Sequence, residues 1–514
     1  MKKIVLSLIL ATGLCVSCSD YLDVNTDPNN PTDVSVDLIM PAAQTHLATT
    51  MAVYLQAYTG FFAQYFDQGL GANAYNELCD YSFGTDQFDD IYEDTYAATL
   101  EDLHQIQIKC EEDADWGNYF AATVLRCYAF QVIADLFGSA PYSEALLGSA
   151  NATPAWDGGS DIYAGLLAEL DAAEALLEGS ETVTAGYILT GDVSEWVKVA
   201  NTLRLKLLMR GSFAQDNSTA IKALISEGNF ITSDVEFDAF EATDNKRNPW
   251  YETYDNSTSM VAAYPIASIY IYHKDTRIPA LFEYNDNGNI FGLIPGSKND
   301  TARNQTEYNE DQSLQSYIYL IDNPYIDMEV RPISLLTTME LNFFLAEAYL
   351  RFYSDDASAE AAYHAAVDAS FDMYNTLGGS TAAESLVYGA GKYGEWPSAG
   401  SEEDKLEVIG LQKWIGLAMV NNMESWCELR RMGYPSLSSV SGTLMLNSTE
   451  EEYPTYTAGD QITPTCSIFL PTNSSLLQSV YFPTASSTLN PNTPSNGTGT
   501  TQLMNEIWWD VREN

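Results

Sequence analysis

The sequence predicts a mostly α-helical fold with long irregular insertions. Apolar residues recur at helical spacing through most of residues 37–230 and again through residues 333–435. Between them, residues 228–335 are rich in Asn, Asp, Tyr, Gly and Pro and hold only short apolar runs, which is typical of loops, short helices and hairpins. With 514 residues, 46% of them apolar, the chain is long enough to bury a large core.

The first helical part has clear start and stop signals. Gly138 is a predicted left-handed stop, and Pro141 blocks any continuation. Asp192 is a predicted N-cap for a helix whose apolar stripe runs from Trp196 to Gly211. The helices expected here cover residues 37–66 (as one long or two shorter helices), 86–112, 116–137, 161–177 and 192–211.

The second helical part contains a pair of helices over residues 333–352 and 357–377. Small residues at Ala346, Ala362 and Ala366 permit close packing, so the pair resembles one tetratricopeptide helix hairpin, although no strict 34-residue period runs through the chain. Two more helices are expected within residues 401–432, ended by Gly433 and Pro435.

The last part, residues 436–514, is rich in Ser, Thr, Pro and Asn. It ends on the apolar run Ile507-Trp508-Trp509, which suggests that an irregular tail wraps back onto the body. The cysteines beyond residue 18 are odd in number and have no CxxC spacing, so buried thiols are favoured over one or two disulfides. They are Cys79, Cys110, Cys127, Cys427 and Cys466.

The N-terminus carries an export signal. Two lysines precede an apolar run over residues 4–14, so residues 1–17 are predicted to be a signal peptide. Small residues before Cys18 resemble a bacterial lipobox, which makes Cys18 the predicted lipidation site; the alternative is an ordinary secretory signal. Residues 18–36 are polar and are expected to be a lipid-anchored tether to a single body over residues 37–514. No later apolar run indicates a second anchor, so the lipid would be the only membrane attachment.

Charge excludes one large class of function. The formal net charge is −48, from 71 acidic and 23 basic side chains. A nucleic-acid binder needs a basic surface that displaces counterions, so no nucleic-acid partner is expected. The same imbalance argues against electrostatic docking on anionic lipid.

Motifs for catalysis and for cofactors are absent from the sequence. The four histidines, His46, His104, His273 and His364, do not pair at metal-ligand spacing. There is no nucleophile elbow, phosphate-binding loop or dinucleotide fingerprint. We therefore expect no metal, no cofactor and no enzymatic activity. With 71 acidic side chains, however, a carboxylate pair like that of a glycosidase is possible by chance.

Two groups of aromatic residues lie outside the predicted helices, among Asn and Asp. Aromatic rings cover the apolar face of a sugar, while Asn and Asp bond its hydroxyls. The alternative is that these rings fill the core. The predicted ligand-binding residues are Tyr75, Tyr81, Trp250, Tyr251 and Tyr254 for stacking, with Asn73 and Asp80 as polar partners.

Seven short motifs follow one another from residue 18 to about residue 492. They are Cys18 with Leu22-Asp23; Asp135-Leu136-Phe137-Gly138 with Pro141-Tyr142; Trp196 with Ala200-Asn201 and Leu203-Arg204-Leu205; Asp275-Thr276-Arg277-Ile278-Pro279; Glu340 with Phe343-Phe344-Leu345-Ala346-Glu347-Ala348; Gln412-Lys413-Trp414-Ile415 with Glu428-Leu429-Arg430-Arg431; and Tyr481-Phe482-Pro483. In this order they resemble the SusD/RagB family of nutrient-binding lipoproteins of Bacteroidetes. Thr276 stands where the family usually has Pro.

The resemblance implies a scaffold of tetratricopeptide-like helix pairs whose irregular insertions carry the binding face. It also implies a protein anchored in the outer membrane by lipid and facing the cell exterior. Its partner would be a SusC-like TonB-dependent outer-membrane transporter. The implied role is to capture an oligomeric nutrient, above all a glycan, and to deliver it to that transporter without catalysis.

Three other functions stay open. A RagB-type member would capture peptides, and the net charge of −48 would favour cationic ones. A surface glycoside hydrolase would release products from a glycan. A protein–protein scaffold using the helix pairs alone would bind no small ligand.

Overall fold

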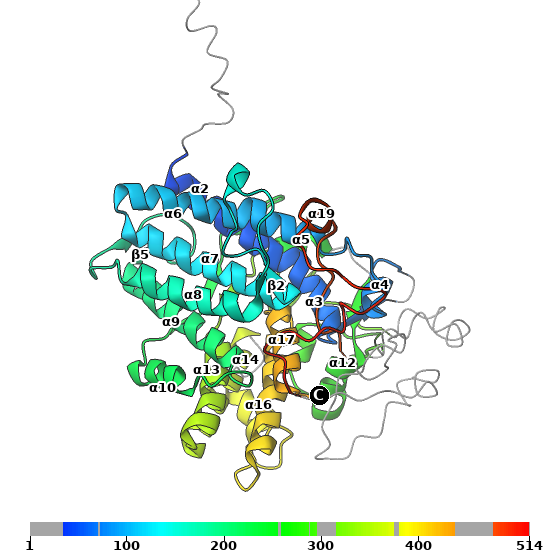
Figure 1. Cartoon of the computed structure of the whole chain (residues 1–514). Coiled ribbons are helices and arrows are strands. Elements are labelled where there is room, and N and C mark those ends of the chain that lie inside the picture. Colours follow the sequence, from blue (N-terminus) through cyan, green and yellow to red (C-terminus); the bar gives the residue numbers. More distant parts are fainter. Residues whose placement is uncertain are drawn as a thin grey trace, which may run out of the picture.

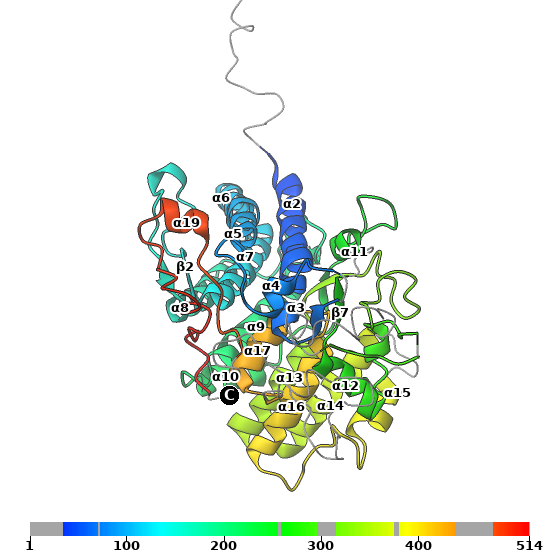
Figure 2. The same cartoon turned by 90° about the vertical axis from the view of Figure 1, so that its right-hand side faces the viewer.

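The computed structural model describes residues 34–69, 72–254, 259–286, 288–293, 295, 315–374, 380–436 and 476–512. The predicted signal peptide, Cys18 and Cys466 lie outside these residues. The described part is mostly helical, as the sequence predicts, and Figures 1 and 2 show its helices in two perpendicular views.

The helices of the first part form successive layers in chain order, from α6 through α7 and α8 to α9 (Figure 1). Two π-helical turns, η1 and η2, each join two helices end to end. Residues 36–62 therefore form one long helix. The elements are α2 (Val36–Thr49), η1 (Thr50–Leu55), α3 (Gln56–Phe62), α4 (Asn76–Cys79), α5 (Asp89–Asp94), η2 (Thr95–Leu100), α6 (Glu101–Asp113), α7 (Trp116–Phe137), η3 (Gly148–Ala150), α8 (Gly159–Glu174), α9 (Val193–Arg210) and α10 (Ser218–Glu227).

The predicted helix signals act as expected. Asp192 caps α9, because its carboxylate accepts a hydrogen bond from the Ser194 backbone N–H at 2.8 Å. Gly138 ends α7 in the left-handed region with φ of 77°. By length and hydropathy α7 could cross a membrane, but 94% of its most apolar window is buried, so it is a core helix.

The second part begins differently from the prediction. The helix expected from residue 333 starts only at Thr338, and Ile333–Leu336 form strand β8 instead. All four residues are buried and pair antiparallel with strand β6 (Val235–Phe237), a partner about 100 residues away that sequence spacing cannot reveal. Thr337 then caps the helix by accepting from the Glu340 N–H at 3.1 Å.

The predicted helix pair is present. Helices α13 and α14 pack closely against each other, with Ala346, Ala362 and Ala366 buried. The elements of this part are α13 (Thr338–Ala348), η7 (Tyr349–Tyr353), α14 (Asp356–Met373), α15 (Ser380–Ala383), η8 (Glu384–Tyr388), α16 (Glu402–Leu417) and α17 (Asn422–Met432).

The middle region consists of loops with short elements, as predicted. Strand β1 (Phe66–Gln68) pairs antiparallel with β7 (Met260–Ala262) and so ties the loop after α3 to this region. The other elements are α11 (Pro249–Tyr254), α12 (Tyr264–His273) and η4 (Ile278–Ala280). Two further two-stranded sheets pair β2 (Ser139–Ala140) with β3 (Asp157–Gly158) and β4 (Thr182–Val183) with β5 (Gly191–Asp192).

The described C-terminal residues pack into the core. This part carries one helix, α19 (Thr484–Leu489). Leu503, Ile507 and Trp509 are buried, and the Trp509 indole N–H donates to the Asp135 carboxylate at 2.8 Å. The four described cysteines, Cys79, Cys110, Cys127 and Cys427, are buried free thiols, which confirms that prediction for them.

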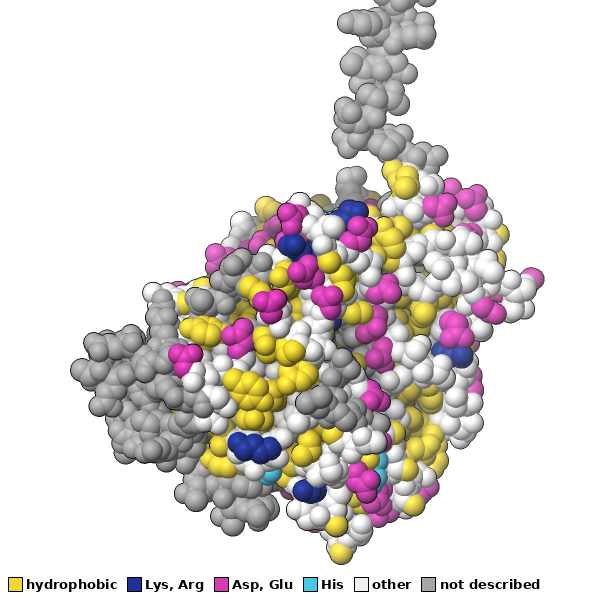
Figure 3. Space-filling model, turned by 180° about the vertical axis from the view of Figure 1, so that it is seen from behind, with side chains coloured by type: hydrophobic (Ala, Val, Ile, Leu, Met, Phe, Trp, Pro, Cys, Tyr) yellow, Lys and Arg dark blue, Asp and Glu magenta, His cyan; other side chains and the backbone are white. Residues whose placement is uncertain are grey.

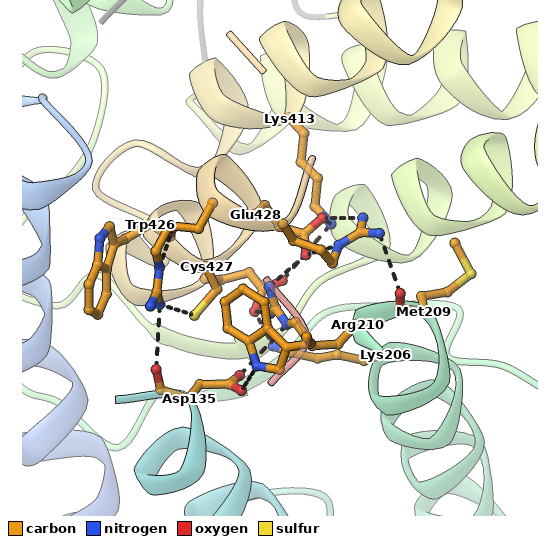
Figure 4. A network of polar contacts seen from close by, with 12 residues as sticks. Asp135, Lys206, Met209, Arg210, Lys413, Trp426, Cys427 and Glu428 are labelled. Atoms are coloured by element: carbon orange, nitrogen blue, oxygen red, sulfur yellow. Dashed lines mark hydrogen bonds and ion pairs between the residues drawn. The ribbon is translucent and has the colours of Figure 1, made fainter. Parts of the chain in front are cut away.

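Charged side chains hold the centre of the body together (Figure 4). Glu428 on α17 accepts from Arg210 at 2.6 Å, from Lys413 at 2.9 Å and from Arg431 at 2.6 Å. Every side chain of this buried ionic network is at most 5% exposed. Its members are Asp135, Lys206, Arg210, Glu340, Glu347, Lys413, Glu424, Glu428 and Arg431.

Burial of basic side chains makes the surface more acidic than the composition suggests. In the described part, eight Lys and Arg side chains and eight Asp and Glu side chains are buried, whereas the whole sequence holds 23 basic and 71 acidic residues. Figure 3 shows the result on one face, where acidic side chains are widely scattered and basic ones are few. Cationic or neutral ligands therefore meet a more favourable field than polyanions do.

Candidate functional site

The first predicted aromatic group lies around α4. Tyr81 is only 2% exposed and meets the ring of Phe62 edge-on at 5.9 Å. Tyr75 is half-buried, with its ring centroid 5.3 Å from that of Phe61. The predicted polar partner Asn73 is exposed, whereas the Asp80 carboxylate accepts from the Ser82 N–H at 3.1 Å and so shapes the loop.

The second predicted group lies on α11 and is buried. Trp250 stacks on Phe66 at 6.1 Å and contacts Tyr254 at 4.6 Å. The Tyr254 hydroxyl donates to the Val53 carbonyl at 3.0 Å. Tyr81, Trp250 and Tyr254 thus occupy core positions, which is what the alternative interpretation of these rings expects.

The structure brings the two groups together. Rings in contact lead from Tyr75 through Phe61 and Phe66 to Trp250, next to the β1–β7 pair. Tyr54 and Tyr58, one helical turn apart on η1 and α3, extend this group, with ring centroids 6.2 Å apart. Burial raises the pKa of Tyr58 to about 12, so its hydroxyl stays protonated and can donate a hydrogen bond.

A cavity of about 430 Å³ lies beside α11, and we call it the Tyr251 cavity. Tyr251 and Tyr325 supply aromatic rings, and the guanidinium of Arg247 lies 5.7 Å from the Tyr251 ring centroid. Arg247 also pairs with Glu329 at 3.0 Å, which fixes this wall. The polar lining residues are Asp322, Asn323, Asp327 and Glu329.

A second cavity of about 440 Å³ borders the first, and we call it the Arg331 cavity. The two share Tyr325, Ile326 and Asp327 as lining residues. The charged lining residues of the Arg331 cavity are Asp234, Glu236, Asp327 and Arg331. A third, much smaller cavity of about 30 Å³ is lined by Trp250 and Arg331 and has room for about one water molecule.

Burial shifts the pKa values of two charged groups that line the Arg331 cavity. Burial raises the pKa of the Glu236 carboxyl, although the Ser334 hydroxyl donates to it at 2.8 Å. Burial also lowers the pKa of the Arg331 guanidinium, which nevertheless remains charged. Rings, carboxylates, amides and one guanidinium around two adjoining cavities can bind a polyhydroxylated molecule. Within the described residues, no three His, Cys, Asp or Glu side chains are placed to hold a metal ion.

Sequence reasoning missed part of this site. Tyr251 and Trp250 were predicted and line cavities, but Tyr325 and Arg331 were not predicted. Their only local signal was the Asn-, Asp- and Pro-rich composition of residues 228–335. Tyr54 and Tyr58 were not predicted as site residues because they lie within a helical pattern. Their spacing of four residues nevertheless places them on one helix face.

The model of the SusD-like_2 family, described as starch-binding and associating with the outer membrane, matches residues 28–454. The chain belongs to this SusD-like family. The predicted resemblance is thereby confirmed, and the family description names a binding activity rather than a reaction.

Solved structures share the SusD-like fold. A chitin-binding SusD homologue from Flavobacterium johnsoniae is 21% identical with a TM-score of 0.70, covering 92% of this chain and 98% of that one. A SusD homologue from Bacteroides fragilis is 18% identical with a TM-score of 0.70, covering 94% and 100%. One from Bacteroides thetaiotaomicron is 20% identical with a TM-score of 0.68, covering 94% and 100%. The comparison with curated proteins returns no match.

Proposed function

We propose that this SusD-like protein is a cell-surface lipoprotein that captures an oligosaccharide and delivers it to a SusC-like TonB-dependent outer-membrane transporter. The observation that carries the proposal is the pair of adjoining cavities with Tyr251 and Tyr325 at their edge and carboxylates, amides and Arg331 in their walls. The starch-binding description of the family and the chitin-binding relative support a glycan ligand. The protein would bind its ligand without turnover.

A binding screen tests the ligand class. The full chain in detergent would be titrated calorimetrically with maltoheptaose, chitohexaose, oligogalacturonate and a tryptic peptide digest, and each mixture would be checked for cleavage products. Saccharide binding without products supports the proposal. Binding of peptides alone would favour the RagB-type function, for which the acidic lining of the Tyr251 cavity is the specific argument. Released products would indicate a glycoside hydrolase.

Tyr251→Ala and Tyr325→Ala are each expected to weaken saccharide binding by about tenfold, since an aromatic ring against a sugar face contributes roughly 1–1.5 kcal/mol. Tyr75→Ala tests whether the half-buried ring near α4 also contacts the ligand. The matched control is Tyr353→Ala, because Tyr353 is 37% exposed and lines neither cavity. Unchanged affinity in both Tyr251→Ala and Tyr325→Ala would remove the Tyr251 cavity from the proposal.

Cys18→Ala is expected to move the protein from the outer-membrane fraction to the soluble fraction, because acyl chains on Cys18 would be its only membrane attachment. Cell fractionation and immunoblotting measure the change. A strain without the transporter is used, since that partner could hold the protein in place. The matched control is Cys15→Ala, and continued membrane fractionation of Cys18→Ala would contradict lipidation at Cys18.

The partner is tested separately. A tagged copy expressed in its host is expected to copurify with a TonB-dependent barrel after mild solubilisation. Isolation of the tagged protein without any such barrel, in repeated preparations that retain saccharide binding, would contradict the delivery role and leave the binding role intact.

A further inference from the structure

Arg331 differs from the other arginines of the described part of the chain. Each of the other nine guanidinium groups donates at least one hydrogen bond to a protein oxygen. Among the described residues, the Arg331 guanidinium has no such acceptor, and no carboxylate oxygen lies within 4.0 Å of it. A partly desolvated guanidinium without a partner is costly, so a ligand that supplies acceptors would be stabilised there.

Arg331 is held at this position by its backbone. The Asn248 side-chain amide donates to the Arg331 carbonyl at 2.6 Å, and the Asn248 N–H donates to the Glu329 carbonyl at 2.7 Å. Pro332 follows and restricts the backbone of Arg331 to extended conformations. The guanidinium therefore borders the Arg331 cavity, where Glu236 attracts it electrostatically but forms no ion pair with it within 4.0 Å.

Carboxylates line the same cavity. Glu236 lies opposite Ser334 in the β6–β8 pair and accepts from its hydroxyl at 2.8 Å. Asp234 accepts from the Thr338 N–H at 2.7 Å and from its hydroxyl at 2.8 Å, while Asp327 is an exposed lining residue of the same cavity. The cavity thus offers a strong donor and several strong acceptors, and the Arg331 guanidinium forms no ion pair within 4.0 Å with any of the described carboxylates.

This combination selects among ligand charges. A hydroxyl group both accepts and donates, so neighbouring hydroxyls can accept from Arg331 and donate to Glu236 or Asp327. A ligand carboxylate would gain Arg331 but face the repulsion of three carboxylates. A ligand ammonium would gain the carboxylates but leave the Arg331 guanidinium without an acceptor and be repelled by it, whereas hydroxyls can serve both. We infer that Arg331 anchors a neutral, hydroxyl-rich saccharide in this cavity; the inference rests on the proposed function and narrows its ligand.

Arg331→Gln tests the inference. The variant in full-length protein is expected to bind maltoheptaose or chitohexaose at least about tenfold more weakly than the wild type in calorimetric titrations, because a charged hydrogen-bond donor is lost. Arg331→Lys keeps the charge but loses the planar guanidinium, so its affinity is expected to lie between those of the wild type and Arg331→Gln. The matched control, Lys198→Gln, neutralises a cation that is paired with Glu195 on α9 and lines neither cavity, so it should leave affinity unchanged. Thermal unfolding of each variant verifies folding.

Glu236→Gln tests independently whether the ligand is neutral. It should weaken neutral saccharides severalfold and strengthen oligogalacturonate, since one repulsive carboxylate is removed. Wild-type preference for oligogalacturonate, or for the cationic chitosan hexamer, would overturn the neutral ligand class. Unchanged neutral-saccharide affinity in Arg331→Gln would overturn the anchoring role while the proposed function stands. If the wild type bound no saccharide of any charge, the proposed function would fail, and the role of Arg331 with it.

Discussion

Glu428→Ala is expected to lower the free energy of unfolding by about 3–5 kcal/mol or to prevent folding, because it leaves buried cations without their carboxylate. Arg210, Lys413 and Arg431 all donate to this one side chain, and each is at most 1% exposed. Water cannot replace the lost acceptor at such depth, so the cost of the unpaired charges falls on the native state. Urea unfolding followed by circular dichroism measures the change.

The matched control for this experiment is Glu195→Ala. Glu195 pairs with Lys198 at 2.7 Å, but its side chain is 50% exposed, so its removal should cost no more than about 1 kcal/mol. Glu428→Gln retains the shape of the side chain and provides a folded variant if the alanine does not accumulate. A loss in both Glu428 variants as small as that of Glu195→Ala would show that the network is not a main source of stability.

Acidification is expected to unfold the protein cooperatively below about pH 4. Neighbouring arginines and lysines lower the pKa of Glu347, Glu424 and Glu428, and Arg277 lowers that of Asp275, below the ordinary values of 4.5 and 3.8. The unfolded chain therefore binds protons more readily than the native one. Stability is fully present above the ordinary values and is lost as pH falls through them toward the native pKa values.

One member of the network acts in the opposite direction. Burial raises the pKa of Glu340 to about 7, so the native state holds this proton more tightly, and this group lowers stability as pH rises from 4.5 toward 7. Burial also raises the pKa of Asp510 to about 7, which adds to this decline. The carboxyls with lowered pKa act below their ordinary values instead, so the stability optimum should lie in the weakly acidic range. Urea midpoints measured between about pH 3 and pH 8 test this. A midpoint that stayed constant down to pH 3 would contradict the prediction, and Glu428→Gln should show a shallower acid slope.

Local signals predicted the helices but not the long-range pairs. Asp192 and Gly138 act within one turn of their own helices, so their roles were visible in the sequence. Strand β8 was wrongly predicted as helix because its short, mainly apolar sequence suits either structure, and its partner β6 decides between them. The π-helical turns have no recognisable sequence pattern.

The candidate site was predicted only in part for the same reason. Composition indicated that loops within residues 228–335 carry a ligand, and Tyr251 does line a cavity there. Which side of α11 faces the core depends on contacts with Phe66 and Val53, almost 200 residues away. Arg331 stands out because its guanidinium has no hydrogen-bond acceptor among the described residues, which no linear pattern records.

The motifs behind the family resemblance now have a physical explanation. Asp135, Glu347 and Arg431 belong to the buried ionic network, and Asp275 pairs with Arg277 at 2.7 Å in a fully buried clamp. These groups constrain one another and therefore specify the fold. Ligand-facing residues are free of that constraint, so relatives that are 18–21% identical share the architecture without revealing what this protein binds.

The contact between Trp509 and Asp135 has a consequence for biosynthesis. Trp509 also lies 5.2 Å below the guanidinium of Arg210 and 4.9 Å from that of Arg430, so it closes one side of the buried charges. Ribosomes synthesise it after every helix that contributes to the network. The centre of the protein can thus be sealed only after this segment has been synthesised, so a chain truncated before Trp509 is expected to leave the buried charges open on one side.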